Sequence, residues 1–218
     1  MKKYILFSFI LFTGCSSVFQ LNEAPKPSGN DIVGTTDFHW VDLNRVEENS
    51  SSNLNRELMV KLWYPAISSG TGERMPRIEN ADLLIQSLSE EFGLPKATMV
   101  NVKAIKSYSF QDIDPNIIDS PYPLIIFSHG LGGMKTQNLI QIEELVSHGY
   151  VVAACDHTYD AYMTYFPDGR KVSSDNTLPI GISDDEIWVI REKQLKTRAF
   201  DIIFLLDPIC DLSHRVYR

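Results

Sequence analysis

The segment from Pro123 to His157 constrains the fold of this chain more than any other part of the sequence. It opens with an apolar run, Leu124 to Phe127, typical of a strand buried on both faces of a parallel sheet. A glycine-rich stretch follows, then apolar residues at helical spacing between Lys135 and His148, and a second apolar run from Tyr150 to Ala154. Strand, helix and strand in this order predict a βαβ unit with a parallel sheet.

Shorter patterns before and after this unit predict further elements. Residues 38–41 and 57–64 are expected to form early strands, and the polar run 45–56 between them a solvated turn. Asn80 is expected to cap a helix that runs through Phe92 and covers the core, because Gly93 and Pro95 follow as stop signals.

Two more elements are predicted after the βαβ unit. A small hairpin is expected on either side of the turn sequence Pro-Asp-Gly at 167–169. A long helix is expected to start at Ser183, where Ser183 and Glu186 form a capping box, and to end at Pro208.

Composition excludes some classes of partner. The 218 residues are 44% hydrophobic and 22% charged, which is ordinary for one globular domain. A net charge of −8 supplies no basic field for nucleic acid, so no nucleic-acid role is expected. Cys155 lies in an apolar run and is expected to be a buried unpaired thiol, although export would permit a disulfide with Cys210.

The N-terminus has the layout of an export signal. Two lysines precede an apolar run that is too short to span a bilayer, so residues 1–14 are interpreted as a lipoprotein-type signal peptide. Cys15 after Thr-Gly resembles a lipidated cysteine, although Phe12 stands where a lipobox usually has leucine. An ordinary cleaved signal is the alternative. Residues 15–30 are then a tether, and 31–218 the N-terminal part of the folded domain.

The glycine-rich stretch after the first apolar strand is the candidate chemical site. In the sequence Ser-His-Gly-Leu-Gly-Gly at 128–133, small residues let the backbone N–H groups approach a ligand closely. An ester hydrolase needs such donors, because negative charge collects on the former carbonyl oxygen during acyl transfer. The other interpretation of the same residues is a glycine-rich turn between strand and helix.

Three runs of sequence resemble one known family. VKLWYPA, then PLIIFSHGLGGMKTQNLIQIEELVSHGYVVAACDHTYDA, then REKQLKTRAFDIIFLLD occur in the order seen in platelet-activating-factor acetylhydrolases of the plasma and type II intracellular kind and their bacterial relatives. The resemblance covers most of residues 57–207. It implies an α/β-hydrolase fold, with a mostly parallel sheet flanked by helices and incomplete at the C-terminus.

The resemblance also implies a reaction and a role for one loop residue, Leu131. The family hydrolyses short or oxidised sn-2 acyl groups of phospholipids, without a metal or other cofactor; broader lipase or polyester-hydrolase activity is a related possibility. The position that matches Leu131 supplies a backbone N–H to the oxyanion hole, and His129, Gly130 and Gly132 are expected to support that loop.

The sequence departs from the family where the nucleophile is expected. No two of its glycines stand four residues apart, so the Gly-x-Ser-x-Gly elbow is absent. The nucleophile, acid and histidine are therefore expected to lie outside this chain, which we interpret as a fragment of a longer esterase that is inactive as given. His129 is expected to shape the oxyanion loop, His148 to cap a helix and His157 to follow the second strand. Their spacing does not place three ligands around one point, as a metal site needs.

Three functional hypotheses follow. The first is a serine esterase of the bacterial cell envelope, anchored to a membrane through Cys15, or else periplasmic or secreted. The second is a non-catalytic envelope lipoprotein that keeps the scaffold as a lipid-binding or interaction module. The third is a metal-dependent enzyme that uses the histidines.

Overall fold

The structure is a computed structural model that describes residues 24–50, 53–68, 70 and 72–216. Its internal contacts divide it into two compact units. The smaller unit consists of residues 76–107 together with the described residues that precede Lys26, and the larger unit of residues 26–75 and 108–216. Residues 1–14, which are expected to form a signal peptide, lie outside the described residues, as do Cys15 and most of the expected tether.

A six-stranded mixed sheet forms the centre of the larger unit, with strand order β3-β4-β1-β2-β6-β5. The strands pair in both directions: β1 is antiparallel to β2 and parallel to β4, and β2 is antiparallel to β6. The strands are β1 (Ile32–Val46), β2 (Asn55–Ala66), β3 (Arg74–Pro76), β4 (Lys106–Gln111), β5 (Leu124–Ser128) and β6 (Val151–Asp156). The early strands predicted from the sequence are confirmed, and both are longer than expected.

The predicted βαβ unit is present. Strands β5 and β6 are parallel, and helix α3 (Leu139–Ser147) connects them. The helix begins four residues later than expected, because Lys135 is held by Asp156 through its N–H (2.7 Å) and its ammonium group (2.9 Å). The expectation that β5 is buried on both faces is wrong, because β5 is the last strand of the described sheet and Leu124 is 38% exposed.

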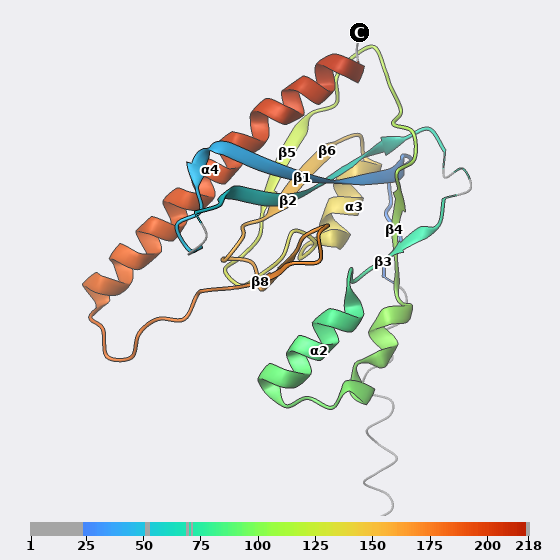
Figure 1. Cartoon of the computed structure of the whole chain (residues 1–218). Helices are drawn as coiled ribbons and strands as arrows, with labels where there is room; N and C mark the ends of the chain where they lie inside the picture. The colour runs from blue at the N-terminus through green and yellow to red at the C-terminus, as the bar shows by residue number, and fades with distance from the viewer. Residues whose placement is uncertain (1–23, 51–52, 69, 71, 217–218) are drawn as a thin grey trace, which may run out of the picture. The chain divides into compact units, whose positions relative to one another are not determined.

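Helices cover both faces of the sheet (Figure 1). On one face, Trp63 of β2 packs into a cluster with Ile142 and Val146 of α3. On the other face, Val60 of β2 belongs to a cluster with Leu205 of helix α4 (Asp184–Val216). Alternate residues of β2 therefore enter opposite cores, and the larger unit has three layers, helix on sheet on helix.

Helix α4 starts as predicted and ends later. The Ser183 N–H donates to Glu186 Oε2 (2.8 Å) and the Glu186 N–H to Ser183 Oγ (3.3 Å), which confirms the capping box. The expected stop at Pro208 is wrong, since the helix continues to Val216. Proline inside a helix costs about 3 kcal/mol, but Leu205 and Ile209 on either side of it are buried in the core, which offsets that cost.

The polar connection between β1 and β2 is not simply a solvated turn, as the sequence suggested. Arg56 is 3% exposed and donates through Nη1 to Glu47 Oε2 at 2.6 Å. Both residues reach inward because a carboxylate of α4, Asp201, also binds Arg56 at 2.6 Å. Charged residues are mostly exposed in proteins, so a run of polar residues in the sequence does not predict that two of them form a buried ion pair.

The predicted small hairpin is also confirmed. Strands β7 (Met163–Tyr165) and β8 (Lys171–Ser173) form a separate two-stranded antiparallel sheet. Gly169 in the turn has φ +87°, a conformation that favours glycine.

The smaller unit contains helix α2 (Ala81–Phe92) and the short 3-10 helices η1 (Lys96–Thr98) and η2 (Val100–Ala104). Gly93 ends α2 in the left-handed conformation, as expected. Asn80 precedes the helix but is itself left-handed and makes no side-chain capping bond, so that part of the prediction is wrong. Lys103 pairs with Asp82 and links η2 to α2.

Cysteine and membrane expectations can be checked in the described part of the chain. Cys155 is 1% exposed with a free thiol, as expected, and no disulfide joins it to Cys210. Among the described residues, no helix combines the length and the apolar character needed to cross a membrane.

Candidate functional site

The carboxyl ends of two parallel strands bring a serine and a histidine together. Ser128 is the last residue of β5, and His157 directly follows β6. Because parallel strands end at the same edge of a sheet, the two side chains meet there, with Ser128 Oγ 3.0 Å from His157 Nε2. Ser128 is exposed, whereas His157 has no exposed surface.

A carboxylate from α4 completes a hydrogen-bonded chain of three side chains. His157 Nδ1 lies 2.9 Å from Asp201 Oδ2, and both groups are fully buried. Burial alone would raise the pKa of Asp201, but hydrogen bonds from His157 and Arg56 outweigh it and lower the pKa to about 2. The ionised carboxylate can only accept, so Nδ1 of His157 carries a proton and donates it to Asp201.

Two arginines hold the carboxylate of Asp201 in place. Arg56 Nε and Nη2 donate to its two oxygens at 3.0 and 2.6 Å, and Arg45 Nη1 donates to Oδ1 at 2.9 Å. The planar guanidinium of Arg56 thus binds Asp201 in a bidentate manner, which fixes the orientation of the carboxylate toward the histidine.

Arg198, one turn before Asp201 on α4, reaches the end of β5. Its Nη2 donates to Ser128 Oγ at 3.0 Å and also to the carbonyl oxygen of His129. Helix α4 therefore contacts both parallel strands near their carboxyl ends. Arg198 binds Ser128 at the end of β5, and Asp201 binds His157 just after β6.

His129 fixes the start of the glycine loop. It is 1% exposed; its Nδ1 donates to the carbonyl oxygen of Gly130 (2.7 Å), and its Nε2 accepts the backbone N–H of His157 (3.1 Å). Burial lowers the pKa of His129 to about 4, so the ring is neutral at pH 7. Through these two bonds, His129 links the glycine loop to the backbone that follows β6.

The glycine loop leaves one backbone donor without an acceptor. The N–H groups of Gly130, Gly132 and Gly133 donate to Gln137 Oε1 (2.9 Å), to the carbonyl oxygen of Asp160 (3.0 Å) and to that of Gly130 (2.8 Å). No acceptor among the described residues takes the N–H of Leu131, whose side chain is 48% exposed. The loop is therefore braced around one donor that is available to a ligand.

Sequence reasoning found the loop but missed the Ser128–His157–Asp201 chain. A usable signal was present for two of its members, since Ser128 ends one strand of the βαβ unit and His157 directly follows the other. Nothing local marked Asp201, in the middle of a helix. His148 is the C-cap of α3, as predicted. Within the described residues, no three His, Cys, Asp or Glu side chains are grouped as metal ligands.

Comparison with known proteins identifies the family. The model of the family "Platelet-activating factor acetylhydrolase, isoform II" matches residues 17–216. The chain is 28% identical to the platelet-activating factor acetylhydrolase of Canis lupus familiaris over 204 residues, which are 87% of this chain and 42% of the relative. It is 30% identical to the enzyme of that name from Cavia porcellus over 156 residues, which are 70% of this chain and 33% of the relative.

A solved structure supports the same fold. The ferulic acid esterase from Streptomyces cinnamoneus superposes with a TM-score of 0.66 and 28% identity, covering 85% of this chain and 48% of the esterase. The chain thus spans less than half the length of these relatives. With this fold and a family model that matches residues 17–216, the chain belongs to the platelet-activating factor acetylhydrolase isoform II family.

Proposed function

We propose that this chain provides the oxyanion-binding part of a carboxylic ester hydrolase that acts on phospholipids with short or oxidised sn-2 acyl groups. The observation that carries the proposal is the Leu131 N–H, which has no acceptor in the described residues and stands in a braced glycine loop at the end of β5. The relatives, all named for ester hydrolysis, support the reaction class.

Leu131 would act when a nucleophile attacks the ester carbonyl. Negative charge then develops on the carbonyl oxygen, and a backbone donor placed beforehand stabilises it; loss of one such donor typically slows turnover by about 10²- to 10³-fold. His129, Gly130 and Gly132 hold the loop that presents this donor. No cofactor takes part in this step.

The 218 residues do not contain the motif that carries the family's nucleophile. The family's Gly-x-Ser-x-Gly elbow does not occur in these 218 residues, so we propose that they do not hydrolyse esters by the family's route on their own. Ser128, His157 and Asp201 then have a positioning role: together with Arg198 they tie the loop to β6 and α4.

The same hydrogen bonds also favour a second candidate, in which Ser128 is itself the nucleophile. In this candidate the Ser128 hydroxyl would donate to Nε2 of His157, and Asp201 would hold the tautomer that carries its proton on Nδ1, as in a serine hydrolase. Ser128 Oγ would attack the acyl carbon while its proton passes to His157 and then to the leaving alkoxide. Water would afterwards hydrolyse the acyl-serine.

One experiment separates these two candidates. The 218-residue protein is incubated with p-nitrophenyl acetate and with a serine-directed phosphonate, and the adduct is located by mass spectrometry. Ser128→Ala is compared with Ser173→Ala, which changes an exposed serine on β8. No turnover above buffer and no adduct supports the positioning role. An adduct on Ser128, with turnover lost only in Ser128→Ala, shows that Ser128 is the nucleophile.

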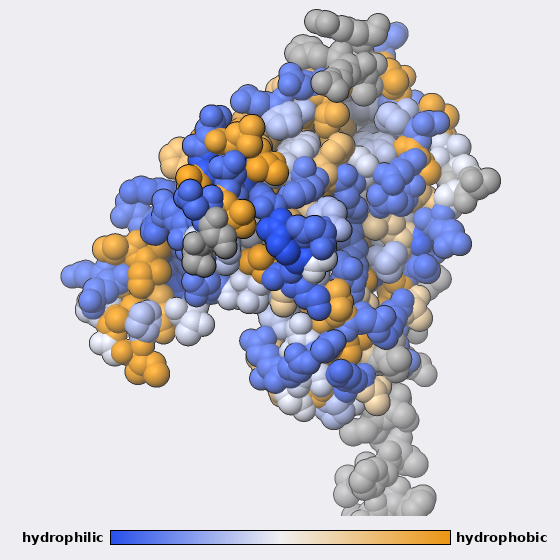
Figure 2. Space-filling model, in the orientation of Figure 1, coloured by the Kyte–Doolittle hydropathy of each residue, from blue (hydrophilic) through white to orange (hydrophobic). Residues whose placement is uncertain are grey.

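A non-catalytic lipid-binding scaffold is favoured by one observation. Helix α4 exposes large hydrophobic side chains, and Figure 2 shows hydrophobic surface over its N-terminal part, at the left. The large hydrophobic residues exposed along the whole helix are Trp188, Val189, Leu195, Phe200, Ile203 and Leu206. Flotation with phosphatidylcholine vesicles tests this function: binding that Trp188→Ser weakens, without ester turnover, would support it, and absence of binding would exclude it.

We also propose that Cys15 is lipidated and anchors the protein in the bacterial cell envelope; a periplasmic or secreted protein is the alternative. The proposal rests on the sequence before Cys15. Metabolic labelling with an alkyne fatty acid is expected to mark the wild type and Cys210→Ser but not Cys15→Ser. Equal labelling of Cys15→Ser would contradict the anchor.

A further inference from the structure

The outer edge of strand β5 carries backbone groups that no described residue binds. β5 is the last strand of the described sheet, next to β6. The carbonyl oxygen of Pro123 accepts the N–H of Val151 at 3.0 Å, so the backbone of Pro123 points toward β6. Because the backbone of a strand alternates, the N–H and C=O groups of Leu124, Ile126 and Ser128 point away from β6. This edge is therefore open to a further strand.

The side chains of β5 do nothing to protect this edge. Residues 124–127 are all apolar, and neither a charge nor a proline interrupts the strand. Proteins usually guard an exposed edge with charged residues, prolines or a covering element, because an open apolar edge pairs with other chains. The edge of β5 therefore suits a polypeptide strand as its partner.

Helix α4 presents an exposed apolar side next to the same edge. Arg198 marks this side, because its Nη2 binds Ser128 at the end of β5. Leu195 and Ile202 are surface neighbours of Arg198, three residues before it and four after it, and Leu206 follows Ile202 by four. Leu195 is 60% exposed and Leu206 is 40% exposed. We call this side the α4 stripe, which consists of Leu195, Ile202, Ile203 and Leu206.

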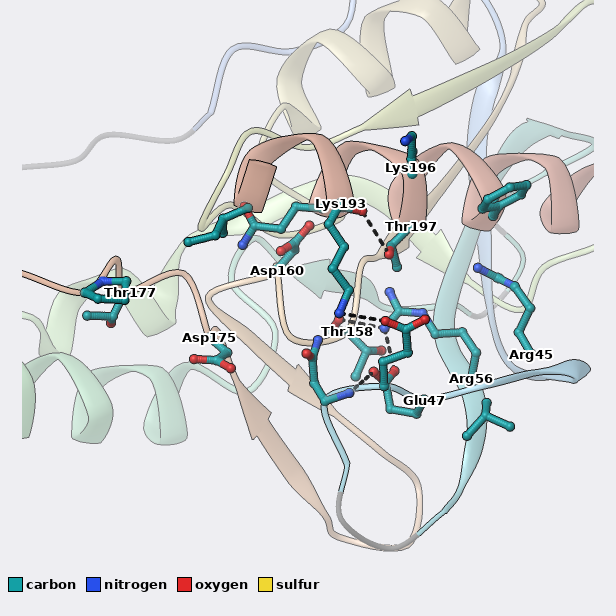
Figure 3. A pocket seen from close by; sticks show the side chains of 17 residues that line it. Arg45, Glu47, Arg56, Thr158, Asp160, Asp175, Thr177, Lys193, Lys196 and Thr197 are labelled. Carbon is teal, nitrogen blue, oxygen red and sulfur yellow. Dashed lines mark hydrogen bonds and ion pairs between the residues drawn. The ribbon is translucent and has the colours of Figure 1, made fainter. Parts of the chain in front are cut away.

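The opposite side of α4 faces β1 and has other neighbours. The guanidinium of Arg45 lies 6.0 Å from the ring centroid of Phe204. Lys193 and Thr197 line, with Arg45, a cavity of about 740 Å³ between α4 and the loops of the sheet (Figure 3). No residue of the α4 stripe lines this cavity, so the stripe faces outward on the β5 side.

The middle of β5 and the middle of the α4 stripe lie at the same level. Arg198 contacts the end of β5, whereas Ile126 in the middle of β5 packs against the cluster that contains Leu205 and Ile209. Helix α4 therefore runs opposite to β5 and passes the middle of the strand near Ile203, which is 59% exposed. The strand edge and the stripe form one continuous surface.

The charges along α4 indicate what covers this surface. Between residues 193 and 211, the exposed charges before Ile203 are Lys193 and Lys196, and those after it are Asp207 and Asp211. Two antiparallel copies of the helix would place the lysines of one near the aspartates of the other. Ion pairs at the rim of an interface add little stability but favour one orientation of the partners.

We propose that β5 and the α4 stripe form the interface of a symmetric dimer of this chain. The two β5 strands pair antiparallel about a two-fold axis at Ile126, so that Leu124 of each copy faces Ser128 of the other. About six backbone hydrogen bonds then join the strands. Residues 121–123 of each copy precede its Leu124 and therefore stand beside the start of the other copy's glycine loop. The dimer thus adds a wall to the candidate site, and the inference does not depend on ester hydrolysis.

Sedimentation velocity of the 218-residue protein over a range of concentrations tests the dimer. The wild type is expected to shift, as the concentration rises, to a species of twice the 24.7 kDa of one chain. Ile203→Glu places two carboxylates near the axis and is expected to raise the dissociation constant more than about tenfold. Leu43→Glu is the control, because Leu43 is 77% exposed on β1, which β2 and β6 separate from β5. A monomeric wild type, or unchanged association of Ile203→Glu, overturns the proposal.

A charge-swap experiment locates the two-fold axis. Ile203→Glu and Ile203→Lys are each expected to be monomeric, because like charges meet at the axis. An equimolar mixture of the two variants is expected to restore the dimer. A mixture of the two folded variants that stays monomeric overturns the placement of α4 beside the axis.

Hydrogen exchange of individual amides tests the strand pairing by itself. The N–H of Ile126 points to the open edge, whereas that of Ile125 points to β6. In the wild type, exchange at Ile126 is expected to slow more than about tenfold as the dimer forms, with no such change at Ile125. Fast exchange of Ile126 in the dimer overturns the pairing. If Ile203→Glu does not fold, this measurement on the wild type decides.

Lipid is the competing occupant of the α4 stripe. Flotation of the wild type with phosphatidylcholine vesicles is measured beside the sedimentation experiment. A wild type that is monomeric and floats, with flotation lost in Ile203→Glu, shows that lipid covers the stripe and overturns the dimer. Dimer formation without flotation supports it.

Discussion

His157 Nδ1 lies 2.9 Å from the carboxylate oxygen Oδ2 of Asp201, and neither side chain has exposed surface. This contact joins the loop after β6 to the middle of α4. Because Arg56 binds the same carboxylate, three separate segments of the chain converge on one buried negative charge. The carboxylate therefore influences both the stability of the fold and the geometry of the site.

Replacement of Asp201 by asparagine is expected to lower the free energy of unfolding by about 3 kcal/mol or more, because the buried charge of Arg56 loses its main partner. Urea unfolding followed by circular dichroism measures the loss. Asp207→Asn, which changes an exposed carboxylate on the same helix, serves as the control and should leave the unfolding midpoint unchanged. Similar midpoints for the two variants would show that the buried network contributes little.

The low pKa of His129 predicts a pH dependence of stability. The folded-state pKa is about 4, below an unfolded value of about 6.5, so the unfolded chain takes up a proton first as the pH falls. The contribution of His129 is present in full above pH ~6.5 and declines by about 3 kcal/mol down to pH ~4.

Urea unfolding of the wild type, His129→Gln and His148→Gln across this range tests the expectation. The His129→Gln profile should lack the decline between pH ~6.5 and ~4. His148, which caps α3 and is exposed, is the matched control, and its variant should follow the wild type. Parallel profiles for all three proteins would show that His129 does not titrate in this way.

The conformation of Gly132 predicts a difference between two neighbouring glycines. Gly132 has φ +70°, so Gly132→Ala is expected to cost about 1–2 kcal/mol of stability through backbone strain alone, since an added Cβ would contact nothing. Gly130→Ala is the control, because its Cβ would meet Gln137 at an ordinary 3.6 Å. Denaturant midpoints measure both, and equal destabilisation by the two variants would contradict the role of strain.

The two cysteines of the described part are expected to react differently. Cys155 is 1% exposed, and burial raises the pKa of its thiol well above the usual value, so little reactive thiolate is present. Iodoacetamide should therefore modify the exposed Cys210 in the native protein and Cys155 only after unfolding. Mass spectrometry of the tryptic peptides reads the result, and rapid native labelling of Cys155 would indicate that the sheet opens at β6.

Local patterns allowed much of the fold to be predicted. The βαβ unit, the small hairpin and the capping box at Ser183 depend on apolar spacing and turn chemistry within short stretches. The extension of α4 past Pro208 could not be predicted in this way, because burial of Leu205 and Ile209 against β2 outweighs a local preference. The left-handed conformation of Asn80 could not be predicted either, because asparagine before an apolar helical pattern usually indicates a side-chain cap.

For the candidate site, the sequence by itself determined the glycine loop and the position of Leu131 in it, since three glycines directly follow an apolar strand pattern and precede a helical one. Only the tertiary structure decided that Ser128, His157 and Asp201 meet. The physical reason is separation along the chain. Hydrogen bonds across 29 and 44 residues depend on how the sheet and α4 pack, which no local pattern encodes.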